Sequence, residues 1–388
     1  MEKKIEKIKN ATKNIAENIN LKLSIIKHKI TFYLTKIKPI KLFSFMGIDF
    51  TISYSWFVGL TITSYIIYKG LFSVLYPNFP PIVLVISSII SALMLYISIA
   101  LHELAHSFIA KRYQINIREI RMFILGGIAI FDKELPTPEA EFKTAVAGPL
   151  LSMVLGLFFL GIGFTIQEKS PITGIIIYTA IANLVIAIFN LVPAFPLDGG
   201  RVLRSLLWKK YDLIKATKIV AELGKAFGIF LIFVSAYYTA KGYYIKPIIG
   251  SLLGVYITIM SRVALQNTLI SHALSNIKVK EILIPAQELN QEPSIIINST
   301  KNTNKEMFKM IGMMLAEKIN IESFFVKEND TLLDAFIKFN KFPMIESLIV
   351  IDEKNNKVGI ILKEILEKIK EIKLKEIELK EKLNISEA

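Results

Sequence analysis

The sequence predicts an α-helical polytopic membrane protein with a small soluble α/β domain behind its membrane-spanning part. Three observations lead to this fold class. The 388-residue chain is 53% hydrophobic and only 21% charged, whereas an ordinary soluble domain is about 25% charged. Six apolar stretches are each long enough to cross a hydrocarbon core, which takes about 20 residues of helix. From Asn276 onward the composition changes to that of a soluble protein.

The N-terminal segment, residues 1–43, is predicted to be a basic amphipathic arm on the cytoplasmic side. It holds eleven lysines against three glutamates, and apolar residues such as Ile5, Ile8 and Ile15 recur at roughly helical spacing. Such a helix can lie on a membrane surface, and a solvated tail is the alternative. Because no compact apolar run with a cleavage site follows the lysines, we do not expect a cleaved signal peptide.

The apolar stretches form a transmembrane core at residues 44–266. We place them at about 53–77, 82–110, 142–166, 172–193, 222–240 and 247–265. Six spans put both ends of the core on one side of the membrane. The segments on that side are rich in Lys and Arg, which is typical of cytoplasmic loops, and the opposite loops are short with few charges. Both termini are therefore predicted to be cytoplasmic in a multi-pass protein of the cell membrane.

The formal net charge of +14 fits these basic cytoplasmic flanks. Lys and Arg beside membrane spans face anionic lipid, so the lipid bilayer accounts for the charge and we expect no nucleic acid as a partner. The chain has no cysteine, which excludes disulfides and thiolate metal sites.

The C-terminal third predicts a small α/β domain at residues 276–370. Residues 323–326, 347–351 and 358–361 are rich in β-branched and other large apolar residues, and residues 330–339 have a helical period. This order of strand, helix, strand and strand, followed by a further helix, is typical of a compact α/β module. Residues 371–388 belong to a charged helical tail of mixed sign, which we expect to have a solvated face.

The sequence His102-Glu103-Leu104-Ala105-His106 is an HExxH pattern at the cytoplasmic end of the second span. In a helix, residues i and i+4 lie on one face about 6 Å apart, so the two imidazoles can share one metal ion. Glu103 lies beside that face, where its carboxylate can take a proton from water activated by the metal. Ionisable residues inside a membrane usually serve a function. The alternative is a helix end whose polar residues mark the membrane interface.

A third metal ligand is required, because a hydrolytic zinc site has three protein ligands and one open position. Without cysteine this ligand must be His, Asp or Glu, and His28 and His272 lie in soluble flanks. Asp198 is the better candidate, since the fourth span returns to the cytoplasmic side just before it. Two prolines interrupt the helix there, and Gly199 and Gly200 allow a tight turn that can aim the carboxylate inward. An Asp–Gly turn paired with one of the following arginines is the alternative.

These residues resemble the site-two protease family of intramembrane zinc metalloproteases. HELAH in one membrane helix is followed in a later one by Asn-x-x-Pro-x-x-Pro-Leu-Asp-Gly-Gly-Arg, which begins at Asn190. Leu125-Gly126-Gly127 and Ala147-Gly148-Pro149 add to the match. The resemblance covers about residues 43–265, and the combination of the two main motifs is highly specific.

The resemblance implies an activity and a set of site residues. It implies hydrolysis of peptide bonds in or near transmembrane segments of membrane-protein substrates, within regulated proteolysis, and one Zn²⁺ per chain. It also implies a small membrane-embedded β element whose edge holds the substrate strand. The implied residues are His102, His106 and Asp198 as zinc ligands, Glu103 as general base, Asn190 as a polar helper in catalysis, and Gly126 and Gly127 as substrate-binding residues.

Residues 320–366 resemble one CBS motif, a module often found behind the protease core in this family. The Thr and Asp that usually contact ribose are replaced by Leu362 and Glu364, and residues 276–319 hold no equally clear second copy. Nucleotide binding is therefore less expected than dimerisation or docking. The partner interaction we expect is a homodimer through this CBS-like domain.

Two other functions fit parts of the sequence. A metal or ion transporter also places His and Asp in membrane helices, but it should show several such residues along a path, or repeated halves. A catalytically silent homologue that binds membrane partners is the second alternative, although the four presumed active-site residues are all present. Several small or polar residues of the later spans are expected mainly to pack helices together, namely Ser152, Gly156, Gly161 and Asn183.

Overall fold

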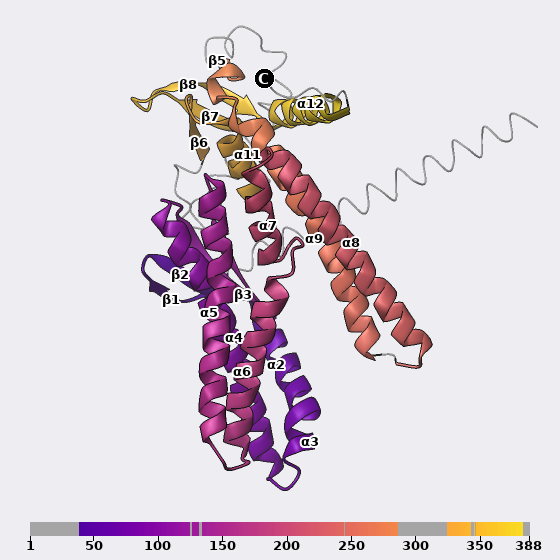
Figure 1. The fold of residues 1–388 in the computed structure, drawn as a ribbon. Helices are drawn as coiled ribbons and strands as arrows, with labels where there is room; N and C mark the ends of the chain where they lie inside the picture. The colour runs from indigo at the N-terminus through magenta and orange to yellow at the C-terminus, as the bar shows by residue number, and fades with distance from the viewer. Residues whose placement is uncertain are drawn as a thin grey trace, which may run out of the picture. The chain divides into compact units, whose positions relative to one another are not determined.

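The structure, a computed structural model, describes residues 39–124, 126–131, 134–243, 245–285, 324–342, 345 and 347–382. Most of the predicted arm, Leu125 and residues 286–323 of the predicted soluble domain lie outside the described residues. The chain divides into two compact units, Met1–Lys210 and Tyr211–Ala388 (Figure 1).

The helices of the first unit begin where the sequence supplies start signals. α4, α5 and α6 each begin at a proline, whose missing N–H is not needed in the first turn of a helix. The side chains of Thr137 and Ser170 cap α5 and α6 by accepting hydrogen bonds from the N–H groups of Ala140 and Thr173. The helices are α2 (Tyr54–Ile67), continued by η1 (Tyr68–Phe72) and α3 (Ser73–Leu75), then α4 (Pro81–Arg112), α5 (Pro138–Thr165), α6 (Pro171–Asn190) and the short α7 (Asp198–Trp208).

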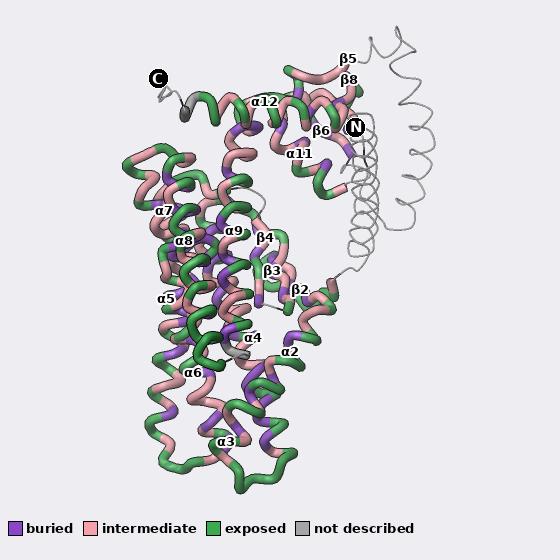
Figure 2. Tube along the Cα trace, turned by 90° about the vertical axis from the view of Figure 1, so that its right-hand side faces the viewer, coloured by how far each residue is buried: buried purple, intermediate pink, exposed green. Residues whose placement is uncertain are grey.

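Six helices in the described part of the chain are long and apolar enough to cross a membrane, which confirms the predicted number. Two spans differ clearly in their bounds. The fifth begins at Leu213 rather than near residue 222, because Asp212 caps it through the N–H of Lys215, and the sixth continues to Ser275 rather than ending near residue 265. Many residues of these helices are exposed (Figure 2). They include large apolar residues, as expected of surfaces that meet lipid. The chain is a multi-pass membrane protein of mostly helical structure. The spans are Tyr54–Leu75, Pro81–Arg112, Pro138–Thr165, Pro171–Asn190, Leu213–Ala240 and Pro247–Ser275.

A four-stranded sheet packs against α4 in the first unit, so the small β element implied by the resemblance is present. β1–β2 and β3–β4 are antiparallel pairs, while β2 runs parallel to β3. Ile48, Ile117 and Ile120 are buried in the core that the sheet shares with α4. β4 lies at one edge of the sheet. In sheet order the strands are β1 (Ile40–Phe45), β2 (Ile48–Ile52), β3 (Ile117–Phe123) and β4 (Gly126–Phe131).

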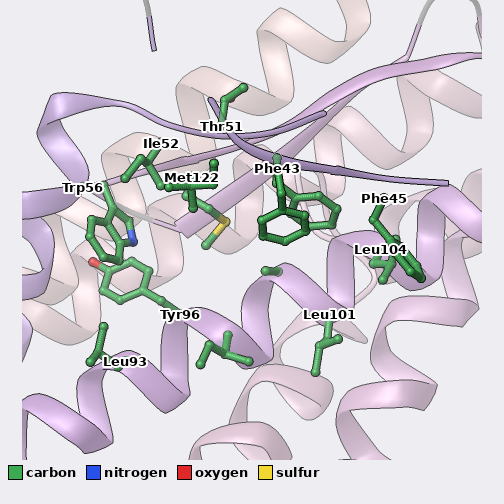
Figure 3. Close-up of a pocket in the computed structure, with 14 residues that line it drawn as sticks. Phe43, Phe45, Thr51, Ile52, Trp56, Leu93, Tyr96, Leu101, Leu104 and Met122 are labelled. Carbon is green, nitrogen blue, oxygen red and sulfur yellow. The ribbon is translucent and has the colours of Figure 1, made fainter. Parts of the chain in front are cut away.

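An apolar cavity of about 360 Å³ lies between this sheet and α4 (Figure 3). Phe43 and Met122 line it from the sheet, and Leu93 and Leu104 line it from α4. Helical periodicity puts these two leucines on the side of α4 away from His102. The cavity is therefore not the site that the sequence motifs predict.

The second unit contains a helix pair and an α/β module. α8 (Leu213–Ala240) and α9 (Ile245–Ser275) approach closely at two glycines, where a Cβ on Gly228 would lie 2.6 Å from the carbonyl oxygen of Gly254. Leu274, at the end of α9, is fully buried in the core of the module. The second compact unit begins at Tyr211, before the helix pair, and the predicted start of the soluble domain near residue 276 lies within this unit.

The strands and helices of the module fall where the sequence predicts them between residues 323 and 366. Its sheet has the order β5-β8-β7-β6, with β6 parallel to β7 and β8 antiparallel to β7. The further helix predicted after the last strand and the first part of the charged tail predicted from residue 371 form one helix, α12. The elements are η2 (Val279–Glu281), β5 (Ile284–Pro285), β6 (Phe325–Lys327), α11 (Leu332–Lys341), β7 (Ser347–Ile351), β8 (Lys357–Leu362) and α12 (Lys363–Lys382).

Candidate metal centre

The two histidines of the HExxH pattern lie on one face of α4 near its C-terminal end. Each is 4% exposed, in a helix that is otherwise apolar enough to span a membrane. Their Nε2 atoms are 3.1 Å apart. The spacing of four residues therefore brings both imidazoles to one point, as the sequence predicts.

Asp198 reaches this point from α7, almost a hundred residues later in the chain. Its Oδ2 lies 3.0 Å from Nε2 of His102 and 3.2 Å from Nε2 of His106. Asp198 is the first residue of α7, and the two glycines after it allow the sharp turn from α6. A Cβ on Gly199 would lie 2.3 Å from the carbonyl oxygen of Leu191, so a larger residue does not fit.

The alternative in which Asp198 only closes a turn does not describe the geometry, because its carboxylate meets the histidines. The arginines that follow have other contacts. Arg204 donates hydrogen bonds to Glu141 of α5, and Arg201 lies over the ring of Phe131 at 5.9 Å from its centroid.

α5 orients both imidazoles toward Asp198. Nδ1–H of His106 donates to the backbone carbonyl of Thr144 at 2.6 Å, and Nδ1 of His102 is 3.0 Å from Oγ of Ser152. Both Nδ1 atoms thus contact α5, and both Nε2 atoms point toward the Asp198 carboxylate. Gly148 lies between these two partners on α5, and a Cβ there would be 2.3 Å from Nε2 of His106 and 2.6 Å from Nε2 of His102.

Glu103 lies beside the histidines and is held by the edge strand β4. Its Oε2 accepts a hydrogen bond from the backbone N–H of Ala129 at 3.2 Å. Gly127 of β4 also passes close to this side chain, since a Cβ there would lie 3.1 Å from Cγ of Glu103. The edge strand β4 and the carboxylate of Glu103 therefore face one another.

The donor set fits a metal ion. His102, His106 and Asp198 each offer one ligand atom, and these atoms lie within 4.8 Å of one another. In a tetrahedral zinc site with bonds of about 2.0–2.1 Å, ligand atoms are roughly 3.3 Å apart, close to the separations here. Burial favours the neutral form of Asp198, but the two imidazoles outweigh burial and hold the pKa of this carboxyl well below its usual value.

Comparison with known proteins places the chain in a family. The sequence profile of Peptidase family M50 matches residues 90–176 and 165–234. A shorter protein of Methanocaldococcus jannaschii, named as a candidate zinc metalloprotease, is 30% identical over 146 residues, which are 33% of this chain and 74% of that protein. The chain belongs to peptidase family M50. The matched M50 region contains every site residue that the sequence predicts and ends before the α/β module.

Other relatives extend the M50 comparison. A zinc metalloprotease of M. jannaschii is 33% identical over 193 residues, covering 50% of this chain and 54% of the relative. A candidate zinc metalloprotease of Synechocystis is 38% identical over 192 residues, covering 49% of this chain and 50% of the relative. The chain thus spans about half the length of these two relatives. The solved Site-2 Protease from M. jannaschii aligns with a TM-score of 0.42 and 30% identity, over 58% of this chain and 95% of that one.

Three predicted residues of the M50 region have less direct contacts with the metal centre. Asn190 is the last residue of α6 and is partly buried, and no hydrogen bond within the described residues joins its side chain to the His-His-Asp group. Gly126 and Gly127 begin β4, with Gly126 at a φ of +141°. Their contact with a substrate stays a prediction, although Gly127 lies against Glu103.

Sequence reasoning missed the role of α5 at the metal centre. Ser152 was expected mainly to pack helices, but its hydroxyl contacts His102, and Thr144 and Gly148 precede it at spacings of four residues. That spacing in the span after HExxH is the signal that could have identified this face. Asn183 does join helices as expected, since its amide donates to Oγ of Ser98 on α4.

Proposed function

We propose that the protein is an intramembrane zinc metalloprotease that hydrolyses peptide bonds in or near transmembrane segments of other membrane proteins. The observation that carries the proposal is the meeting of His102, His106 and Asp198 at one buried point, next to Glu103 and within the bundle of a multi-pass protein. M50 relatives that are named zinc metalloproteases support zinc as the metal. His102, His106 and Asp198 would hold one zinc ion per chain.

The residues around the metal centre would divide the chemistry between them. Zinc at this place supplies Lewis acidity that polarises the scissile carbonyl and makes water nucleophilic near neutral pH. Since Oε2 of Glu103 accepts a hydrogen bond from the N–H of Ala129, Oε1 of Glu103 would be the atom that takes the proton from water and passes it to the leaving nitrogen. Ser152 and Thr144 contact the Nδ1 atoms and would hold the imidazoles in the orientation in which their Nε2 atoms can bind the metal.

The site also suggests how a substrate segment is bound. A peptide bond within a membrane helix is protected, because its polar groups are bonded internally and water is excluded. A segment that unwinds beside β4 could pair with the free edge of this strand, which would satisfy its backbone groups and bring it next to Glu103. Gly126 and Gly127 would then be substrate-binding residues, and Asn190, at the end of α6, a polar helper near the scissile carbonyl.

A second proposal concerns the function of the C-terminal α/β module. The element order β6-α11-β7-β8-α12 supports the resemblance to one CBS motif that the sequence suggests, and we propose a CBS-like module that dimerises or docks rather than one that binds nucleotide. Leu362 and Glu364 stand where Thr and Asp usually contact ribose. Cross-linking of the full chain in membranes, with and without adenine nucleotides, tests this. A dimer whose yield is independent of nucleotide is expected, and a nucleotide-dependent yield would contradict the proposal.

The test of the proteolytic function is co-expression with candidate membrane-protein substrates, comparing the natural chain with Glu103→Gln. Glu103 is not a ligand in this scheme, so the variant should keep its zinc and accumulate uncut substrate. General-base loss lowers the rate by about a hundred- to ten-thousandfold. Cleavage at the natural rate by Glu103→Gln would refute the assigned base. Zinc binding without cleavage of any membrane protein by the natural chain would favour a catalytically silent homologue.

A further inference from the structure

The placement of Asp198 depends on how α7 is held. The histidines belong to the long helix α4, whereas Asp198 begins an eleven-residue helix that follows a turn rich in prolines and glycines. A short helix in such a position has little intrinsic stability of its own. α7 packs against α5, the helix that already orients both imidazoles through Thr144 and Ser152.

A buried ion pair joins these two helices. Nε of Arg204 on α7 donates to Oε1 of Glu141 on α5 at 2.7 Å, and Nη2 of Arg204 donates to the same oxygen. Glu141 is 1% exposed and the side chain of Arg204 is 14% exposed. Arg204 also lies over the ring of Phe195, 5.3 Å from its centroid, in the turn that leads into α7. One guanidinium therefore contacts α5 and the turn before Asp198 at once.

The position of the pair relates it to the metal centre. Glu141 is three residues before Thr144, whose carbonyl accepts the hydrogen bond from His106, so both lie on the same side of α5. Arg204 is six residues after Asp198 on α7. The ion pair thus ties the helix that carries the third ligand to the helix that orients the other two.

We propose that Glu141 and Arg204 are positioning residues that set the distance of the Asp198 carboxylate from the two imidazoles. Replacing a buried ion pair with apolar residues of similar size usually changes the free energy of unfolding little. Removing only one partner lowers this free energy strongly, because the other charge stays buried without a partner. The contribution of the ion pair here is geometric. The charge-assisted hydrogen bonds fix the rotation of α7 about its own axis and its position along α5. The inference rests on the proposed zinc centre, and it adds residues that the motifs do not contain.

The test compares two double variants of the full chain in detergent. Glu141→Met/Arg204→Met removes both charges and keeps side-chain volume, so it should fold, whereas Arg204→Met alone leaves a buried carboxylate uncompensated. Glu139→Met/Lys143→Met is the matched control, because this ion pair lies on the same helix, is exposed and joins two residues one turn apart on α5. Zinc affinity, the visible absorption of bound Co²⁺ and the thermal unfolding midpoint of the metal-free chain are measured.

We expect Glu141→Met/Arg204→Met to unfold near the midpoint of the natural chain but to bind zinc about ten- to a hundredfold more weakly, as when outer partners of metal ligands are lost. Its Co²⁺ absorption should also change, since the carboxylate is displaced. The control variant should match the natural chain in all three measurements. If the natural chain binds no zinc, the proposed function fails. Natural zinc affinity and Co²⁺ absorption in a folded Glu141→Met/Arg204→Met variant would overturn the positioning role alone.

Discussion

Gly148 of α5 lies directly against Nε2 of His106, so close that a Cβ on this residue would be 2.3 Å from that nitrogen. The contact is with the nitrogen that faces Asp198 and not with Nδ1 on the other side of the ring. The glycine is therefore required by the space in which the two imidazoles meet Asp198, and not by the conformation of the helix backbone.

Gly148→Ala should abolish zinc binding without unfolding the protein. Alanine in place of glycine in an exposed helix interior stabilises the helix by about 1 kcal/mol, so the substitution does not weaken α5 itself. Loss of zinc would therefore come from the clash of the added Cβ with His102 and His106. Zinc content of the purified variant is the measurement. The matched control is Gly161→Ala on the same helix, where a Cβ meets no atom within 4 Å. A zinc-replete Gly148→Ala variant would show that the imidazoles do not meet the metal through Nε2.

Removal of a single ligand should empty the zinc site. The natural chain should hold about one zinc per molecule, and His102→Ala, His106→Ala or Asp198→Asn should each lose it, because two remaining ligands bind zinc far more weakly. Metal analysis after purification checks this. His28→Ala and His272→Ala serve as controls and should retain zinc. Retained zinc in Asp198→Asn would remove Asp198 from the ligand set.

The metal centre could be predicted from sequence where its geometry is local or follows from topology. His102 and His106 are related by helical period alone, and Asp198 follows from the return of a later span to the same side of the membrane. The sheet was expected only through the resemblance, because a short β element of apolar residues beside a membrane span has no distinct periodic signal.

The spacing of Thr144, Gly148 and Ser152 could have indicated which face of α5 meets the metal centre, but the contacts that these residues make could not be predicted, because they depend on the rotation of one helix against another. Ser152 has the same sequence signature whether its hydroxyl packs between helices or contacts an imidazole. The backbone carbonyl of Thr144 has no sequence signature at all. Glu141 and Arg204 were ordinary charges near span ends until the structure placed them against each other.

Membrane orientation is a separate prediction. Reporters fused after Leu42, within residues 133–137 and at Ala388 should all report the cytoplasm, because the flanking segments are rich in Lys and Arg. A reporter at Lys169, between α5 and α6, should report the opposite side. Alkaline phosphatase and fluorescent-protein fusions at each position measure this. An external signal from residues 133–137 would contradict the predicted orientation of α4 and α5.

A substitution at Gly127 can distinguish two roles of the β4 edge, namely leaving room for the Glu103 side chain and binding the substrate. A Cβ on this residue would lie 2.9 Å from Sδ of Met122 and 3.1 Å from Cγ of Glu103, so Gly127→Ala should push the general base out of place. A displacement of about 1 Å can lower a rate by a hundredfold. We therefore expect kcat on a membrane substrate to fall while KM and zinc content stay close to those of the natural chain. Gly161→Ala is again the control, and its kinetics should not change.

The same experiment gives a different result if Gly127 acts mainly on the substrate. Interactions that bind substrate and transition state equally affect KM and leave kcat unchanged. A Gly127→Ala variant with raised KM and natural kcat would therefore assign the glycine to the substrate-binding edge and reject its role in leaving room for Glu103. Loss of zinc from this variant would contradict both assignments, because Gly127 lies against the base and not against a ligand.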